Sequence, residues 1–141
     1  MATELDGLAE EPERRVWAGY SETTIDHMQN PRNFGSIADA DGFASVDGSC
    51  GDNLEIWIKV RDDLIQEATF WADGCGTTVA CGSMVTELVK GKSVEEATCA
   101  SERQILEGLG WLPEESHHCA MLAASTLRAA LEDYRRRLAA G

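Results

Sequence analysis

Apolar and polar residues alternate over 54–60, and this period of two predicts a strand with one buried face. A second alternating segment, 64–72, follows directly after the turn residues 61–63. So short a connection predicts an antiparallel hairpin. We expect Leu64 to share the buried face of the second strand with Phe70.

The segment before this hairpin is rich in glycine, aspartate and asparagine. Its few apolar residues predict one irregular edge strand within about 36–48, followed by a glycine-flanked loop around Cys50. Further upstream, 16–28 has near-helical apolar spacing, with Ser21 as a candidate cap. This helix must end before Pro31, because the residue preceding a proline is pushed out of the α region.

After the hairpin the apolar period becomes helical. A stripe over 77–89 predicts a helix that ends at Gly91. Ser93 and Ser101 each open a short helix, the first with a capping box, and 118–138 forms the last and longest helix. Strands followed by helices indicate an α+β domain, with a small three-stranded antiparallel sheet and helices packed on one face.

Composition and charge limit the number of domains and the classes of binding partner. A chain of 141 residues with 43% hydrophobic residues can fill one core. We expect a flexible acidic arm at 1–18 and one folded domain at 19–141. The net charge of −13 argues against binding nucleic acid or anionic membrane surfaces. The N-terminus resembles neither a secretory signal nor a transit peptide, and a cytoplasmic location is the default.

Cysteine chemistry is the most informative feature. Five cysteines, an odd number, are widely spaced along a chain without a signal peptide: Cys50, Cys75, Cys81, Cys99 and Cys119. Metal binding or thiol chemistry therefore explains them better than a disulfide framework.

Three of these cysteines lie at the ends of predicted elements. Antiparallel pairing brings the start of strand 54–60 and the end of strand 64–72 to one edge, so Cys50 and Cys75 can be neighbours. Cys119 joins them if the last helix begins at that edge. Both Cys75 and Cys119 lie at predicted helix N-termini, where we expect the thiol pKa to be lowered.

Two further donors and several glycines accompany these thiols. Asp52 lies two residues after Cys50, and His118 directly precedes Cys119. Gly51, Gly74 and Gly76 flank Cys50 and Cys75 and leave room for an inorganic cluster. Three thiolates with a carboxylate or imidazole form an unequal ligand set, in which one metal ion is easier to displace than in an all-thiolate site.

The remaining cysteines and histidines are explained without metal binding or thiol chemistry. Cys81 lies on an apolar helical stripe and is expected to be a small core residue. Cys99 is expected to be a partly buried bystander. A surface role suits His117, and packing or a surface role suits His27.

At these residues the sequence resembles the IscU/NifU-type iron–sulfur cluster assembly scaffolds, over about 20–137. The resemblance is carried by four stretches, which read YSETTIDHMQNPRNFGSI, CGDN, FWADGCGTTVACGSMVTELVKGKS and HHCAMLAASTLRAALEDY. It implies that Cys50, Cys75 and Cys119 hold a nascent 2Fe–2S cluster, that Asp52 tunes its release and that His118 can be a ligand. The same pocket can hold zinc when iron is absent.

The resemblance also implies partners. A cysteine desulfurase supplies sulfur as a persulfide, with Cys119 as the expected acceptor, and the cluster passes to apo iron–sulfur proteins or carriers. Family members carry a Leu-Pro-Pro-Val-Lys motif that binds a DnaK-type chaperone, whereas residues 112–116 here read LPEES. We therefore expect weak or no engagement of that chaperone.

Two alternatives stay open at this point. A zinc-dependent sulfur acceptor would be a transferase in which zinc orients a thiolate. A structural adaptor would carry cysteines without chemical function. Under the leading interpretation the chain is a scaffold and carrier, not an enzyme.

Overall fold

The computed structural model describes residues 19–141, and the predicted arm at 1–18 lies outside the described residues. The elements, in chain order, are α3 (Glu22–Gln29), β1 (Gly42–Asp47), β2 (Asn53–Arg61), β3 (Leu64–Asp73), α4 (Gly76–Val89), α5 (Val94–Thr98), α6 (Glu102–Leu109), the 3-10 turn η1 (Glu114–Ser116) and α7 (His117–Ala140). Among these helices none has both the length and the apolar character that crossing a bilayer requires.

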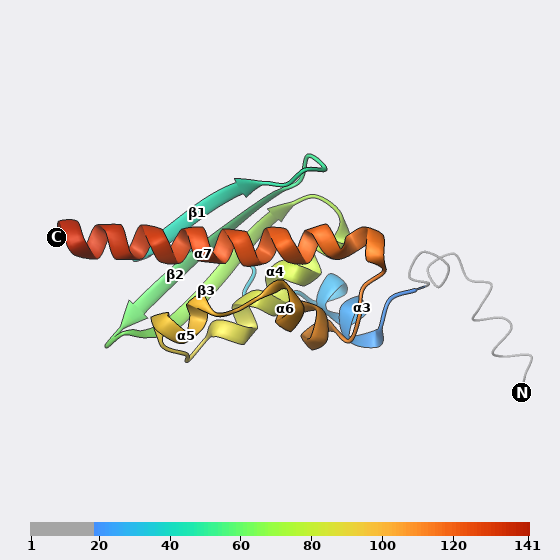
Figure 1. Ribbon diagram of the computed structural model, residues 1–141, viewed down its shortest axis with the longest axis horizontal. Helices are drawn as coiled ribbons and strands as arrows, with labels where there is room; N and C mark the ends of the chain where they lie inside the picture. The colour runs from blue at the N-terminus through green and yellow to red at the C-terminus, as the bar shows by residue number, and fades with distance from the viewer. Residues whose placement is uncertain (1–18) are drawn as a thin grey trace, which may run out of the picture.

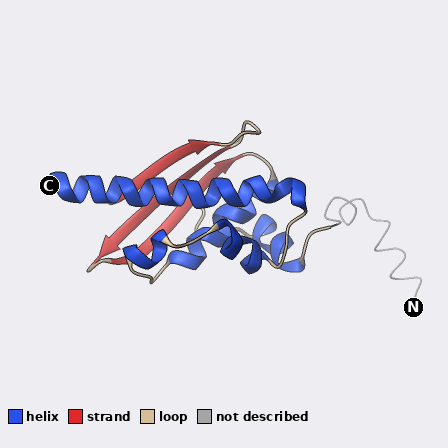
Figure 2. Ribbon diagram, viewed as in Figure 1, coloured by secondary structure: helices blue, strands red, loops and turns tan. Residues whose placement is uncertain are grey.

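The three strands form one antiparallel sheet in the order β1-β2-β3. Ile56 in β2 pairs with Ala44 in β1 and with Phe70 in β3, so these residues share the buried face. Figures 1 and 2 show α7 crossing in front of all three strands, with the shorter helices beside it. The predicted α+β fold, with helices on one face of the sheet, is confirmed.

The β2–β3 hairpin differs from the predicted pattern in one respect. Ile65, not Leu64, enters the core: Ile65 is fully buried, while Leu64 is 48% exposed. Asp62 and Asp63 both adopt left-handed φ angles, as a tight two-residue hairpin turn requires. The ladder then shifts by one residue, leaving Gln66 as a bulge before regular alternation resumes. A strict period of two could not foresee this extra residue.

Helix α4 is the centre of the molecule. It packs against β3, α3 and α7 and is buried on nearly all sides, more widely than the predicted stripe. Gly82 allows the closest approach to the sheet, because a Cβ there would lie 2.5 Å from Cδ2 of Phe70. Gly91, at φ +84°, follows the C-cap of this helix and turns the chain.

The predicted caps are confirmed. The Ser21 side chain accepts from the Thr24 amide, so α3 begins at Glu22, later than the predicted 16–28. Residues 16–18 lie outside the described part. Ser93 and Ser101 both form capping boxes, at the starts of α5 and α6.

Candidate functional site

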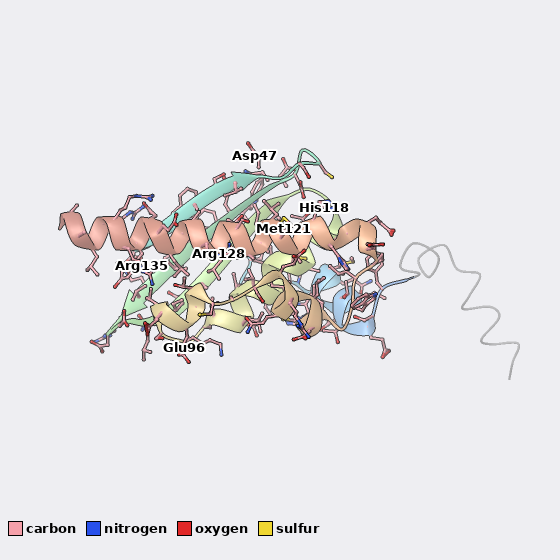
Figure 3. The ribbon with its side chains drawn as sticks, viewed as in Figure 1. Asp47, Glu96, His118, Met121, Arg128 and Arg135 are labelled. Atoms are coloured by element: carbon pink, nitrogen blue, oxygen red, sulfur yellow. The ribbon has the colours of Figure 1, made fainter. Side chains whose placement is uncertain are left out.

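Three chain segments meet at one end of the sheet. The last pair of the β2–β3 ladder joins Asn53 to Asp73, and Asn53 also pairs with Asp47. The β1–β2 loop with Cys50 and the β3–α4 junction with Cys75 therefore leave the sheet at the same edge. The N-terminal end of α7, where Figure 3 labels His118, lies toward the same end of the molecule as Asp47. The predicted convergence of three element ends is confirmed.

These segments enclose a small pocket of about 190 Å³. It is lined by Cys50, Gly51, Asp52, Asp73, Gly74, Cys75 and His118. Cys119 is fully buried beside it and is linked to the lining residues through Thr78 and His118. A larger cavity of about 600 Å³, between α4, α5 and α6, shares no residue with this pocket and contains only Cys99 of the five cysteines.

Asp52 is the most constrained donor. Its side chain is buried, and Oδ2 accepts a 2.8 Å hydrogen bond from the Thr78 hydroxyl. Its other oxygen, Oδ1, is buried without a hydrogen-bond partner among the described residues. A buried carboxylate oxygen without a partner carries a large desolvation penalty. Such an oxygen suits a site that a metal ion or another cation completes.

Two glycines make room for this carboxylate. A Cβ at Gly48 would lie 2.4 Å from Asp52 Oδ1, and one at Gly74 would lie 2.6 Å from Asp52 Cβ. A Cβ at Gly76 would instead contact Met28, with Sδ at 3.3 Å. Gly74 and Gly76 therefore accommodate protein side chains, whereas the predicted role of both was to leave room for a cluster.

Thr78 is the residue that sequence reasoning missed. Its Oγ1 lies 3.6 Å from Cys75 Sγ and 3.6 Å from Cys119 Sγ, in addition to its bond to Asp52. One fully buried hydroxyl therefore contacts three of the predicted donors. The available signal was its spacing: Thr78 is three residues after Cys75, the N-cap of α4, and such residues face each other across the first turn.

His118 presents a ring nitrogen to the site. The Glu115 carbonyl lies 3.0 Å from Nδ1 and can only accept, so Nδ1 carries a proton, and in the neutral imidazole Nε2 has the free lone pair. Nε2 lies 3.5 Å from Cys119 Sγ. A histidine fixed through its other nitrogen by a carbonyl is the usual arrangement for a metal ligand. One donor atom from each of Asp52, His118 and Cys119 lies within 4.8 Å of the others.

The two thiols at helix N-termini differ in acidity. Burial opposes ionisation of Cys75, but hydrogen bonds from Thr78 and Thr77 outweigh it, and the pKa of this thiol lies below its ordinary value, as predicted. For Cys119 the prediction is wrong. Burial raises the pKa of the Cys119 thiol to about 12; the hydrogen bond with Thr78 opposes this, while nearby Cys75 and Asp52 add to it.

Cys50 is the outermost of the three sulfurs. It is exposed in the turn that Gly48 and Gly51 close, where the Gly51 amide donates to the Gly48 carbonyl at 3.2 Å. It lines the pocket without belonging to the tight group of Asp52, His118 and Cys119. Gly51, at φ +84° with open space around it, is the glycine beside the thiols that contacts no side chain.

Of the remaining predictions, two are confirmed and two are wrong. Cys81 is a fully buried core residue, and burial raises its thiol pKa well above the ordinary value. His27 packs in the interior, with Nδ1 2.7 Å from Ser83 Oγ. Cys99 is exposed, not partly buried. His117 is half-buried, not a surface residue, because its ring bonds the Leu112 carbonyl and contacts Trp111 edge-on.

Known proteins are similar to this chain in sequence and in fold. Residues 19–140 match the family described as NifU-like N terminal domain. An iron–sulfur cluster assembly scaffold protein IscU 1 from Archaeoglobus fulgidus is 46% identical over 119 residues, covering 84% of this chain and 78% of its own length. The Escherichia coli K12 IscU scaffold protein is 44% identical over 121 residues, covering 82% and 94%. The crystal structure of a NifU-like protein (N-terminal) from Brucella abortus superposes with a TM-score of 0.66 at 17% identity, covering 86% of this chain and 97% of its own, and this likeness concerns the fold alone.

Proposed function

Because the chain belongs to the family of NifU-like N-terminal domains, we propose that it is a scaffold that assembles a 2Fe–2S cluster from iron and sulfur and transfers it to apo-proteins. The observation that carries the proposal is the unequal donor set. Cys50 and Cys75 line one pocket and Cys119 lies buried beside it. The same site includes the His118 ring and an Asp52 oxygen that has no hydrogen-bond partner among the described residues.

The cluster would be cargo held by Cys50, Cys75 and Cys119, with Asp52 and His118 as the remaining candidate ligands. A carboxylate binds iron less tightly than a thiolate does, so the iron on this side is easier to displace. The exposed Cys50 thiol stands where a recipient protein can reach it. A cluster bound in this way is stable enough to assemble and labile enough to leave.

Sulfur would come from a partner cysteine desulfurase as a persulfide, so the scaffold itself is not an enzyme. In the transfer, a thiolate of this chain attacks the terminal sulfur of the desulfurase persulfide. The sulfur–sulfur bond breaks, and the desulfurase thiolate leaves. Cys119 is the proposed acceptor, and its burial and raised thiol pKa require that desulfurase binding expose and deprotonate it.

Two acidic residues affect the expected binding of a DnaK-type chaperone. Glu114 and Glu115 occupy an exposed 3-10 turn where IscU-type members carry apolar and basic residues for a DnaK-type chaperone. We propose weak or absent chaperone binding. A peptide spanning 111–116 is expected not to stimulate the chaperone's ATPase, and stimulation equal to that by the usual motif would contradict this.

A zinc-dependent sulfur acceptor is the second candidate function. The tight group of a carboxylate, an imidazole and a thiol also fits tetrahedral zinc. Anaerobic reconstitution with iron and sulfide in the presence of zinc separates the two. Visible charge-transfer absorption with acid-labile sulfide supports the scaffold. Zinc that iron and sulfide fail to replace supports the transferase.

Replacing Asp52 tests the scaffold most specifically. Asp52→Ala is expected to lengthen the life of the reconstituted cluster and to slow its transfer to an apo-ferredoxin, because the weak oxygen ligand is gone. Asp73→Ala is the matched control, since this exposed carboxylate lines the same pocket outside the tight donor group. Equal transfer rates for wild type and Asp52→Ala would defeat the assignment of Asp52.

A further inference from the structure

The face of the sheet without helices carries a row of aromatic side chains. Strand alternation places Phe43, Trp57 and Trp71 on this face, because the residues next to them, such as Ile56 and Phe70, are buried on the helix side. In Figure 2 the long helix α7 passes in front of the strands, so the opposite face of the sheet is turned away from the viewer. Phe43 and Trp57 contact each other with ring centroids 5.0 Å apart, and Trp71 is 40% exposed.

Carboxylates surround these aromatic rings on the same face. They are Asp47, Glu55 and Asp73, and Glu55 is the cross-strand partner of Trp71. The fourth carboxylate of this face, Glu67, lies at the far end of the strands opposite Lys59. Among the described residues none of the first three forms an ion pair. The strand segments 43–47, 53–57 and 69–73 contain no lysine or arginine. The end of this face nearest the cysteines is therefore aromatic and negatively charged.

Hydrogen bonds hold two of the carboxylates in place. Asn53 Nδ2 donates to Asp47 Oδ1 and to Ser45 Oγ, each at 3.0 Å, and Ser45 Oγ donates to Glu55 Oε2 at 3.3 Å. One oxygen of each carboxylate is engaged in this network, and the other remains available. The face is thus organised before any partner arrives, which lowers the entropic cost of binding.

We propose that the end of this face nearest the cysteines binds a basic segment of a partner protein, with an arginine placed between Trp71 and Glu55. A guanidinium group stacks on an indole ring and at the same time pairs with a carboxylate in the plane of its N–H groups. Cross-strand neighbours have Cβ atoms about 4.5–5.5 Å apart, close enough for one guanidinium to contact both side chains.

The negative charge of this face favours a basic peptide over a second copy of the chain, nucleic acid or anionic lipid. A second copy of the chain would bring two negative faces together, and like charges across an interface are strongly unfavourable. The phosphates of nucleic acid and of anionic lipid are repelled for the same reason. Asp73 also lines the cysteine pocket, so a partner bound here lies next to the candidate site. The inference concerns the metal-free protein and does not depend on the proposed function.

The test is calorimetric titration of the full metal-free chain with a short synthetic peptide in which arginine alternates with serine. Matched peptides carry lysine or glutamate in place of arginine. We expect the arginine peptide to bind more tightly than the lysine peptide, and the glutamate peptide not to bind. Trp71→Ala and Glu55→Gln should each weaken binding about tenfold, and less than additively together, because both side chains contact one guanidinium.

Matched controls are available elsewhere on the surface. Trp111 is 60% exposed and Glu115 lies in an exposed turn, so Trp111→Ala and Glu115→Gln should change the affinity less than about twofold. Amide shift changes on titration should cluster on β2 and β3. If circular dichroism shows that Trp71→Ala does not fold, the affinity of Glu55→Gln for the arginine peptide tests the proposal by itself.

Three outcomes would overturn the proposal. Equal losses in the control variants, or equal binding of the lysine and arginine peptides, would reduce the effect to non-specific charge attraction. Shift changes confined to other surfaces would place the binding elsewhere. Self-association of the wild type that Trp71→Ala abolishes would show that a second copy covers this face.

Discussion

Removing the Thr78 hydroxyl perturbs the candidate site at its centre without touching a proposed ligand. Thr78→Val keeps the shape of a fully buried side chain and deletes the 2.8 Å hydrogen bond to Asp52 Oδ2. The other Asp52 oxygen already has no partner among the described residues. The variant therefore leaves both oxygens of a buried carboxylate unpaired.

The expected loss follows from the kind of bond. A hydrogen bond to a charged group contributes about 1.5–3 kcal/mol to stability. We expect Thr78→Val to lower the free energy of unfolding by about 2 kcal/mol, or the Tm by roughly 6–10 °C for a domain of this size. Thr126→Val is the matched control, because the equally buried Thr126 hydroxyl bonds only the Leu122 carbonyl of its own helix. Its effect should stay below about 1 kcal/mol.

Urea unfolding of the metal-free protein at neutral pH measures both variants. A double-mutant cycle with Asp52→Ala assigns the effect to the Thr78–Asp52 bond, since Thr78→Val should then have little further effect. If Thr78→Val is no more destabilising than Thr126→Val, the bond to Asp52 does not stabilise the fold. The same conclusion follows if the loss persists unchanged in the Asp52→Ala background.

Two further predictions concern the core. Burial, aided by Arg32, lowers the pKa of His27, so the unfolded chain binds the proton more readily and stability should fall as the pH drops below about 6.5. The fall should be smaller in His27→Gln when urea unfolding is compared at pH values on both sides of this point, and an unchanged slope would contradict the prediction. Gly82→Ala should cost about 1–3 kcal/mol, because its Cβ would lie 2.5 Å from the Phe70 ring, whereas Gly108→Ala meets only the flexible Met84 side chain, at 2.7 Å, and should be nearly neutral. Equal thermal shifts for the two alanine variants would be evidence against the close helix–sheet approach at Gly82.

Local patterns in the sequence predicted most of the fold. The strands, the caps at Ser21, Ser93 and Ser101 and the long last helix follow from periodicity and from hydrogen-bonding side chains near in sequence. The burial of Ile65 in place of Leu64 could not be predicted, because the bulge depends on how a tight turn sets the register of two strands. Strand register is determined by contacts between residues that are far apart in the sequence.

Some features of the candidate site could also be predicted from the sequence, and others could not. Chain topology predicted that Cys50, Cys75 and Cys119 would meet, since strand pairing and helix starts place element ends together. The buried Thr78 hydroxyl and the raised pKa of Cys119 could not be predicted, because both depend on how deeply α7 and α4 pack against each other. Helix N-termini favour thiolates, but full burial outweighed that effect at Cys119.

The proposed function requires three sulfurs that are distant in the sequence to hold one cluster. Iron and acid-labile sulfide are measured after anaerobic reconstitution of the wild type, of single alanine variants at Cys50, Cys75 and Cys119, and of Cys99→Ala as the control outside the pocket. We expect roughly two irons per cluster with visible charge-transfer absorption in the wild type and in Cys99→Ala, and a large loss of both in each of the other three variants. Wild-type iron, sulfide and absorption in any one of those three variants would contradict it.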